Sequence, residues 1–309
     1  MNPKIVVTAN AFSKNKFLVN ELQKFTSNIV LNTSGRYAKE NLIESLKDAQ
    51  GAIVGLDKID ETILKECRNL KIVSKYGVGL DNINLEDCKK YNVQVGWTGG
   101  VNKTSVAEMT LGFMLMLMRN LYTTSNELKS GTWNKSGGFQ LSGKTIGIIG
   151  VGHIGKEVVR LLQPFNCKIL VNDIINQDEY YSQSGLMEST KDEIYKQSDI
   201  ITIHTPLTGD TQDLITLKEI RIMKKSAFVI NTARGGIVNE NDFKIALKEH
   251  IIAGGAIDPY VVEPPTDNEF ISLPNLIATP HIGGNAREAV EAMGMSAIEH
   301  LRNYFKDKR

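Results

Sequence analysis

The sequence predicts an α/β protein with two domains, each built on a doubly wound parallel sheet. Strand-like and helix-like runs alternate from residue 4 onward, and the same alternation restarts at Lys144 after a long helical stretch and a polar loop. Alternation of this kind favours parallel strands joined by crossover helices. A chain of 309 residues is long enough to give both domains a core.

The elements can be placed by hydrophobic periodicity and by their flanking turn residues. The expected strands are residues 4–8, 29–31, 52–54, 71–74 and 93–95, then 144–150, 168–173, 200–204, 227–231, 253–257 and 276–279. The main expected helices are residues 14–25, 37–46, 103–122, 154–162 and 286–305. The last helix follows the final strand, so we expect it to cross back to the first domain. The predicted domains are residues 1–100 with 286–309, and residues 101–285, with an active site in the cleft between them.

Composition narrows the class of partner. The 36 basic and 35 acidic residues nearly cancel, which argues against a nucleic-acid or membrane partner. Cys67, Cys88 and Cys167 are scattered, so we expect neither a disulfide framework nor a metal site, and a reducing cytoplasm fits. The first residues lack the pattern of a signal peptide, and the apolar run 111–118 is too short to span a bilayer and reads as a buried helix.

A glycine-rich motif follows the first strand of the second series. In Gly150-Val-Gly152-His-Ile-Gly155, the first glycine suits a tight turn, the second a close approach to a pyrophosphate, and the third close packing of helix on strand. The pyrophosphate would lie at the positive end of the helix. Asp173 ends the next strand 18 residues after Gly155, where a carboxylate would bind the adenosine ribose. The sequence therefore predicts a dinucleotide site.

A second glycine-rich turn, residues 76–82, follows a strand of the first domain. It has Asn82 where a third glycine would stand, so a nucleotide site is not predicted there. Its exposed backbone N–H groups suit an anion such as a carboxylate. An ordinary strand-to-helix turn explains the spacing equally well.

Four side chains at strand ends of the second domain are candidates for chemistry. Arg234 lies among small residues and is suited to hold a carboxylate, although a surface ion pair is the alternative. Glu263 precedes two prolines that would fix its position, and a solvated glutamate is an equal alternative. His281 follows a proline at a strand end and can exchange a proton near neutral pH. His204 closes another strand and could line the cofactor site, whereas His250 and His300 read as helix-surface residues.

Together these segments resemble the D-isomer-specific 2-hydroxyacid dehydrogenase family over nearly the whole chain. The matching segments are residues 75–82, 102–108, 150–155, 204–208, 231–236, 258–265 and 280–284. The resemblance implies a flavodoxin-like substrate-binding domain and a Rossmann NAD-binding domain. It also implies that Arg234, Glu263 and His281 form the catalytic triad. Their separations of 29 and 18 residues are similar to those of the D-3-phosphoglycerate dehydrogenase branch.

The resemblance also implies roles for residues around the triad. The substrate carboxylate would meet the backbone of Val78 and Gly79, with Asn102 and Arg234 also contacting substrate. Asp258 would meet the nicotinamide carboxamide, and Asp173 would favour NAD over NADP because a 2′-phosphate would face a like charge. The remaining positions that would contact the cofactor are Gly150, Gly152, His153, Ile154, Gly155, His204, Thr205, Pro206, Thr232 and Gly284.

We therefore expect an NAD-dependent D-2-hydroxyacid dehydrogenase, with D-3-phosphoglycerate as the leading substrate because Arg36, Lys58 and Lys75 could bind a phosphate. A reductase of glyoxylate, hydroxypyruvate or another 2-keto acid is the alternative. An NADH-sensing protein similar to the family's corepressors is the alternative of another class. The family's usual dimer implies a homodimer. Helix 103–122 is a candidate contact, although ordinary packing inside the chain explains its apolar side chains equally well.

The chain departs from the family pattern at three positions. The family often has Asn and Pro where this chain has Trp97 and Gly99, and Val where it has Pro259. Trp97 therefore leaves the size of the substrate open. The chain ends at Arg309, so we expect no appended regulatory domain.

Overall fold

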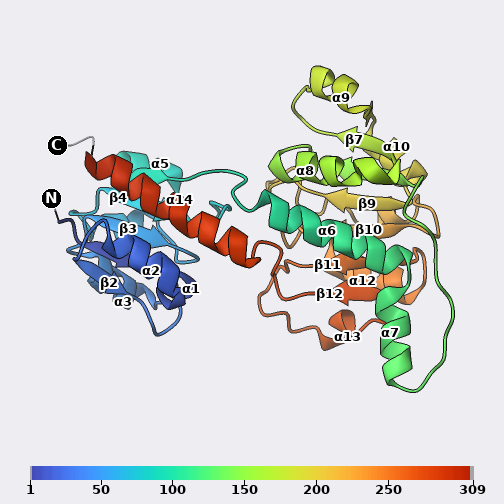
Figure 1. The fold of residues 1–309 in the computed structure, drawn as a ribbon, viewed down its shortest axis with the longest axis horizontal. Helices are drawn as coiled ribbons and strands as arrows, with labels where there is room; N and C mark the ends of the chain where they lie inside the picture. The colour runs from blue at the N-terminus through green and yellow to red at the C-terminus, as the bar shows by residue number, and fades with distance from the viewer. Residues whose placement is uncertain (1, 307–309) are drawn as a thin grey trace. The chain divides into compact units, whose positions relative to one another are not determined.

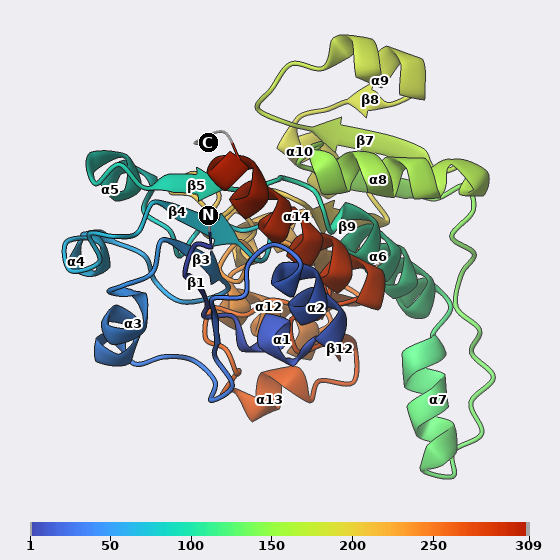
Figure 2. The same cartoon turned by 60° about the vertical axis from the view of Figure 1, so that its left-hand side comes forward.

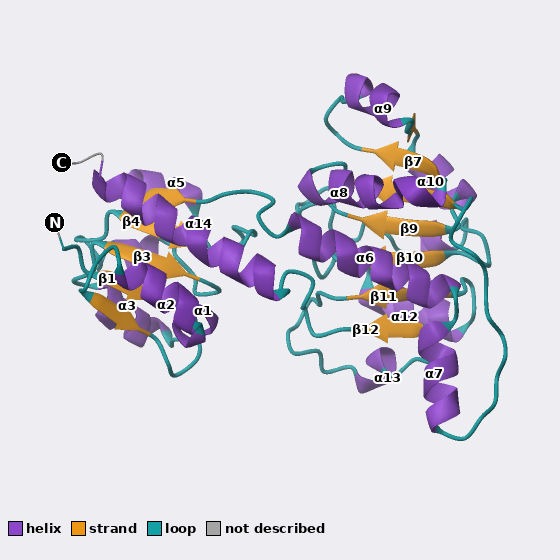
Figure 3. Cartoon of the chain, viewed as in Figure 1, coloured by secondary structure: helices purple, strands orange, loops and turns teal. Residues whose placement is uncertain are grey.

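The computed structural model describes residues 2–306 and divides into two compact units. The first unit contains the chain up to Asn102 together with the stretch from Ala286 onward, and the second runs from Lys103 to Asn285. Each unit has its own parallel sheet with helices on both faces (Figures 1 and 3). The predicted α/β class with two doubly wound sheets is confirmed.

The first unit has five parallel strands in the order β2-β1-β3-β4-β5, the flavodoxin-like order. The strands are β1 (Ile5–Val7), β2 (Ile29–Leu31), β3 (Gly51–Val54), β4 (Ile72–Lys75) and β5 (Gln94–Gly96). The helices are α1 (Asn10–Lys14), α2 (Lys16–Gln23), α3 (Lys39–Leu46), α4 (Glu61–Leu64), α5 (Leu85–Lys90) and α14 (Arg287–Lys306). The expected helix 14–25 is two helices, because Asn15 interrupts the first and caps the second through Leu18 N–H.

Helix α14 packs against the sheet of the first unit although it lies at the other end of the sequence. The Ser74 hydroxyl on β4 donates to the Ala297 carbonyl over 2.8 Å, and both residues are buried. At Gly96 a Cβ atom would lie 2.5 Å from the Cβ of His300, so only glycine allows this close approach. His300 is therefore half-buried against β5, and its Nε2 lies 2.9 Å from the Thr98 hydroxyl.

The second unit has seven parallel strands in the order β12-β11-β10-β9-β6-β7-β8, as in a Rossmann fold. The strands are β6 (Thr145–Ile149), β7 (Lys168–Asn172), β8 (Met187–Glu188), β9 (Ile200–Ile203), β10 (Phe228–Asn231), β11 (Gly254–Ile257) and β12 (Leu276–Ala278). The helices are α6 (Lys103–Met118), α7 (Leu121–Lys129), α8 (His153–Leu162), α9 (Asp178–Ser184), α10 (Lys191–Gln197), α11 (Leu217–Ile220), α12 (Glu240–Lys248) and α13 (Asn268–Ile271), with the 3-10 turn η1 (Gln163–Phe165). Ile148 and Ile149 of β6 enter separate cores on opposite faces, as alternation along a strand requires.

The predicted end of the helix over residues 103–122 is wrong. Helix α6 stops at Met118, and α7 begins at Leu121 after Asn120 adopts a left-handed conformation with φ of 55°. Asparagine tolerates this conformation better than most residues, so the chain can turn here. Helix α6 buries one side only, with Phe113 and Met114 in the core and other apolar side chains half-buried. None of the helices within residues 2–306 is long and apolar enough to cross a membrane.

Helix α7 and residues 130–140, together called the arm, extend from the second unit (Figures 1 and 2). No residue of α7 is buried, and every residue from Leu128 to Gln140 is exposed. The arm is nevertheless held by hydrogen bonds within itself and to the end of α6. The Asn134 amide donates to the Glu127 carboxylate over 2.8 Å, and the Phe139 N–H donates to the Met118 carbonyl over 2.7 Å.

Candidate active site

The glycine-rich turn lies between β6 and α8, next to the point where the strand order reverses between β6 and β9. Gly150 has φ of +95°, and a Cβ atom there would lie 2.7 Å from the His204 backbone. At Gly155 a Cβ atom would lie 2.2 Å from the Gly150 carbonyl oxygen. Gly152, in contrast, has open space at its Cβ position. Gly150 and Gly155 are therefore required by close backbone packing within the fold, whereas Gly152 leaves room for a ligand.

Asp173 lies directly after β7 and is bonded to the same turn. One carboxylate oxygen accepts from Val151 N–H over 2.6 Å, and the other accepts from Ile175 N–H over 2.9 Å. The acid and the glycine-rich turn are thus brought together as the sequence predicted. His153 and Ile154 begin α8, at the helix end whose N–H groups favour an anion.

The segment after β9 presents polar atoms that have no partner within the described chain. His204 Nδ1 and Thr205 Oγ1 are buried without a hydrogen bond among residues 2–306, while His204 Nε2 lies 3.1 Å from Thr202 Oγ1. Burial lowers the pKa of His204 to about 3, so its imidazole is neutral. Buried polar atoms normally find a partner. Their position beside Gly150 therefore fits a polar ligand such as a dinucleotide.

Thr232, unlike His204 and Thr205, has a hydrogen-bond partner for its side chain. It is buried, and its hydroxyl lies 3.0 Å from that of Thr110 on α6, so its polar atom already has a partner inside the unit. Pro206 is exposed, and Gly284 is half-buried in the loop after β12.

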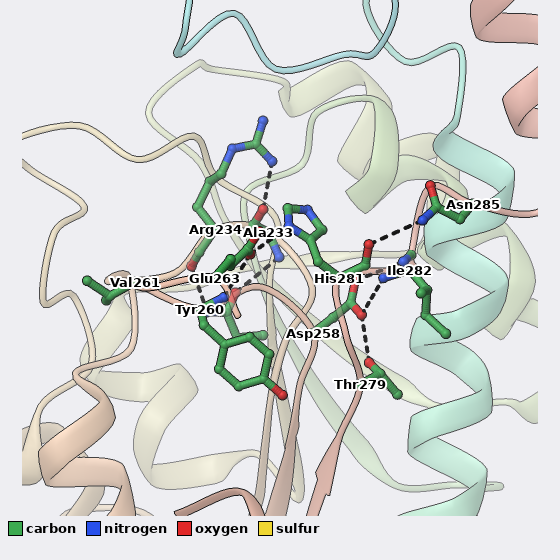
Figure 4. Close-up of polar contacts among 12 residues, drawn as sticks. Ala233, Arg234, Asp258, Tyr260, Val261, Glu263, Thr279, His281, Ile282 and Asn285 are labelled. Carbon is green, nitrogen blue, oxygen red and sulfur yellow. Dashed lines mark hydrogen bonds and ion pairs between the residues drawn. The ribbon is translucent and has the colours of Figure 1, made fainter. Parts of the chain in front are cut away.

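His281 and Glu263 form a hydrogen-bonded pair near the carboxyl ends of β11 and β12 (Figure 4). His281 Nδ1 lies 2.7 Å from Glu263 Oε1, and the same oxygen accepts from Tyr260 N–H over 3.1 Å. The side chains remain 45% and 40% exposed, so both reach solvent. With Nδ1 engaged by the carboxylate, Nε2 is left to face a reacting group. His281 has φ of +52°, an uncommon conformation that occurs at functional sites.

Arg234 is carried by a turn after β10. The Asn231 side chain accepts from Ala233 N–H over 3.0 Å and donates to the Arg234 carbonyl over 2.8 Å, which fixes the turn. The next residue, Gly235, packs its backbone on the following loop, where a Cβ atom would lie 2.1 Å from the Tyr260 carbonyl carbon. The loops that carry Arg234 and Glu263 are therefore in direct contact.

Asp258 performs a task in the fold that sequence reasoning missed. It is 1% exposed, and one carboxylate oxygen accepts from the Thr279 hydroxyl over 2.6 Å and from Ile282 N–H over 2.8 Å. The other oxygen accepts from Gly283 N–H over 2.8 Å. Asp258 thus fixes the backbone on both sides of His281. Its predicted contact with the nicotinamide remains a prediction.

Glu240 is a second residue that sequence reasoning did not single out. Its carboxylate accepts from Val261 N–H over 2.7 Å, and burial followed by nearby acids raises its pKa. It thereby holds the loop that contains Glu263. Its only signal in the sequence is a place near the start of a helix, which is too common to be diagnostic.

In the first unit, the turn that contains Val78 and Gly79 follows β4, and Asn102 is the last residue before the second unit. The three cations considered for a phosphate all have intramolecular partners. Lys75 Nζ is buried and bonds to the Gly55 carbonyl over 2.6 Å. Lys58 pairs with Asp60 over 3.0 Å, and Arg36 donates to the Leu56 carbonyl over 3.3 Å.

The fold and these residues define an α/β protein with a dinucleotide site and a histidine–carboxylate pair. Residues 111–283 match the family model described as D-isomer specific 2-hydroxyacid dehydrogenase, NAD binding domain. The chain belongs to this family, and its second unit is the NAD-binding domain.

Two relatives and one solved structure illustrate the likeness. A D-3-phosphoglycerate dehydrogenase of Methanocaldococcus jannaschii is 36% identical over 87% of this chain and 52% of its own length, so the chain spans about half of that relative. A hydroxypyruvate reductase of Thermotoga maritima is 34% identical over 87% of this chain and 89% of its own length. The structure of D-lactate dehydrogenase from Aquifex aeolicus with NAD and lactic acid is 26% identical, covers 98% of this chain and 96% of its own, and has a TM-score of 0.85.

Proposed function

We propose that this protein is an NAD-dependent D-2-hydroxyacid dehydrogenase. The observation that carries the proposal is the 2.7 Å pair of His281 and Glu263, held beside the turn that contains Arg234. A histidine oriented by a carboxylate is suited to exchange the proton of a hydroxyl group. The relatives named above, which act on hydroxy or keto acids, support the same class of reaction.

In the proposed reaction, bound NAD supplies the acceptor of the hydride from C2 of the hydroxy acid. His281 Nε2 takes the proton of the 2-hydroxyl group as that hydride leaves, and it returns the proton in the reverse direction. Glu263 fixes the imidazole through Nδ1 and offsets the positive charge that forms on it. Arg234 holds the substrate carboxylate and polarises the carbonyl oxygen.

The second unit contains the groups that would hold the cofactor. The N–H groups at the start of α8 would bind the pyrophosphate, and Gly152 would leave room for it. Asp173 would accept hydrogen bonds from the ribose hydroxyls and would repel a 2′-phosphate, which favours NAD over NADP. His204 and Thr205 offer their unpartnered buried atoms to the cofactor.

For the substrate, D-3-phosphoglycerate is the first candidate, supported by the 36% identity to a D-3-phosphoglycerate dehydrogenase. A small unphosphorylated acid such as glyoxylate or hydroxypyruvate is the second. This second candidate is favoured because Lys58 and Lys75 already bond to Asp60 and to the Gly55 carbonyl, which leaves fewer cations for a phosphate. The relative that matches over 89% of its length is a hydroxypyruvate reductase.

We further propose a cytoplasmic homodimer formed through the arm of the second unit. Leu128, Trp133 and Phe139 are exposed on an ordered segment that has no core of its own. Large exposed apolar side chains on one segment favour an interface. The arm, rather than α6 as a whole, is therefore our candidate for contact with a second copy.

The test is NADH oxidation with 3-phosphohydroxypyruvate, hydroxypyruvate and glyoxylate. The first two acids differ only in the phosphate, so their kcat/KM ratio decides between the two substrate candidates. We expect turnover of at least one acid, and NADPH to be the poorer reductant. NADH binding without turnover of any 2-keto acid would overturn the enzyme proposal and support a dinucleotide-sensing protein.

A further inference from the structure

The turn after β4, residues 76–82, is fixed at both ends and is also bonded at the Val78 carbonyl in its middle. At its start, Tyr76 N–H donates to the Val54 carbonyl over 2.9 Å. At its end, the Asn82 amide donates to the Asp57 carbonyl over 2.6 Å and accepts from Lys75 Nζ over 2.5 Å. Between them, Gly77 has φ of +134° and redirects the chain.

The bond at Val78 comes from Trp97. Its indole N–H donates to the Val78 carbonyl over 2.7 Å. Trp97 follows β5, which pairs in parallel with β4, so the two carboxyl ends meet at one edge of the sheet. The side chain is 41% exposed, and it is therefore not retained to fill a core.

The bonded carbonyl belongs to the same peptide group as the Gly79 N–H. This peptide is trans, so the carbonyl and the N–H point in opposite directions. By holding the carbonyl, the indole fixes the direction of the N–H, and a hydrogen bond at the oxygen also strengthens the N–H as a donor. Within residues 2–306, the N–H groups of Val78 and Gly79 have no hydrogen-bond acceptor.

We propose that Trp97 is a positioning residue that orients the Gly79 N–H toward the carboxylate of the substrate. The inference rests on the proposed function, which places that carboxylate at Val78 and Gly79. It assigns a role to the residue at which this chain departs from the family pattern. Trp97 acts through the peptide group and takes no part in proton or hydride transfer.

The kinetic test compares Trp97→Phe, which keeps an aromatic ring but lacks the donor, with wild type. The matched control is Tyr91→Phe, which also removes one donor from an aromatic ring of the same unit, in this case a bond to Glu61 of 3.0 Å. We expect Trp97→Phe to raise KM for the 2-keto acid about three- to tenfold, the range of one neutral hydrogen bond, with kcat and the Kd of NADH within about twofold. Tyr91→Phe should match wild type.

A second measurement follows the backbone amide resonance of Gly79 as oxamate is added to the NADH-saturated protein. Oxamate has a carboxylate in the place of the substrate's but does not react. In wild type the Gly79 resonance should shift, and in Trp97→Phe half-saturation should need about three- to tenfold more oxamate. Trp97→Leu should behave like Trp97→Phe, because the N–H matters and the ring does not.

The outcomes separate this inference from the proposed function. Turnover by wild type with an unchanged KM in Trp97→Phe would overturn the role of Trp97 and leave the dehydrogenase standing. A Gly79 shift weakened by Trp97→Phe in a protein without turnover would support Trp97 and reject the dehydrogenase. A Gly79 resonance that stays fixed at saturating oxamate, or a loss of NADH affinity parallel to the rise in KM, would also overturn the inference.

Discussion

At the scale of single residues, one oxygen of Glu263 holds both His281 and the loop at Tyr260. Replacing Glu263 by Gln keeps the shape but removes the charge that offsets the imidazolium. We expect kcat to fall about tenfold to a hundredfold, and His281→Ala to lower it about 10²–10⁴-fold. Steady-state rates with saturating NADH measure both. Glu249→Gln, on an exposed residue, is the control, and a Glu263→Gln variant as fast as wild type would remove Glu263 from the mechanism.

The lowered pKa of His204 predicts how the free energy of unfolding depends on pH. Its pKa is about 3 in the folded chain and near 6.5 when unfolded, so the unfolded state binds a proton first as pH falls. The contribution of neutral His204 to the free energy of unfolding is therefore fully present above pH 6.5, and it is lost as pH falls toward 3. Between pH 7 and 5 we expect wild type to lose about 2 kcal/mol more than His204→Gln in urea unfolding of the free protein. Equal losses in both proteins would show that His204 does not stay neutral.

Single residues also show where sequence reasoning stopped. It placed Arg234, Glu263 and His281 at strand ends of one sheet, and the structure pairs His281 with Glu263 and packs the loop of Arg234 against that of Glu263. It could not foresee that Asp258 would bond to backbone N–H groups beside His281, since that depends on how the loop folds after β12. It marked Trp97 as unusual but could not give its bond to Val78, which joins turns 19 positions apart.

At the scale of elements, the turn from β6 into α8 contains one glycine required for folding, Gly155, and one proposed to serve cofactor binding, Gly152. An added methyl group at Gly155 would collide with the Gly150 carbonyl, whereas one at Gly152 meets open space. We expect Gly155→Ala to lower Tm by several degrees, and Gly152→Ala to keep Tm while weakening NADH binding at least tenfold. Thermal unfolding and NADH titration test the pair. Normal NADH affinity in Gly152→Ala would place the pyrophosphate elsewhere.

Elements with strong periodicity were predicted to within one or two residues, as β6 and β7 show. The errors occur where local signals are weak. Strand β8 has two residues, too few for any pattern, and it forms by pairing at the sheet edge next to β7. The break between α6 and α7 depends on Asn120 in a left-handed conformation, and the spacing of apolar residues does not predict such a conformation.

At the scale of the whole molecule, the arm predicts assembly. Leu128→Arg and Trp133→Arg would place charges in the proposed interface, at side chains that the chain itself leaves 56% and 76% exposed. We expect both variants to be monomers with unchanged Tm for the second unit, and wild type to be a dimer, by light scattering after gel filtration. Lys135→Glu tests whether charge alone matters. A monomeric wild type would refute the proposed dimer.

The place of α14 has a consequence for how the chain folds during synthesis. The second unit is one continuous stretch, so all of it leaves the ribosome before α14 does. The first unit begins earlier but lacks the helix that covers Ser74 and Gly96 until its last residues emerge. Because domains fold as units once complete, the unit made second should reach its native state first. The first unit must wait with part of its apolar surface uncovered.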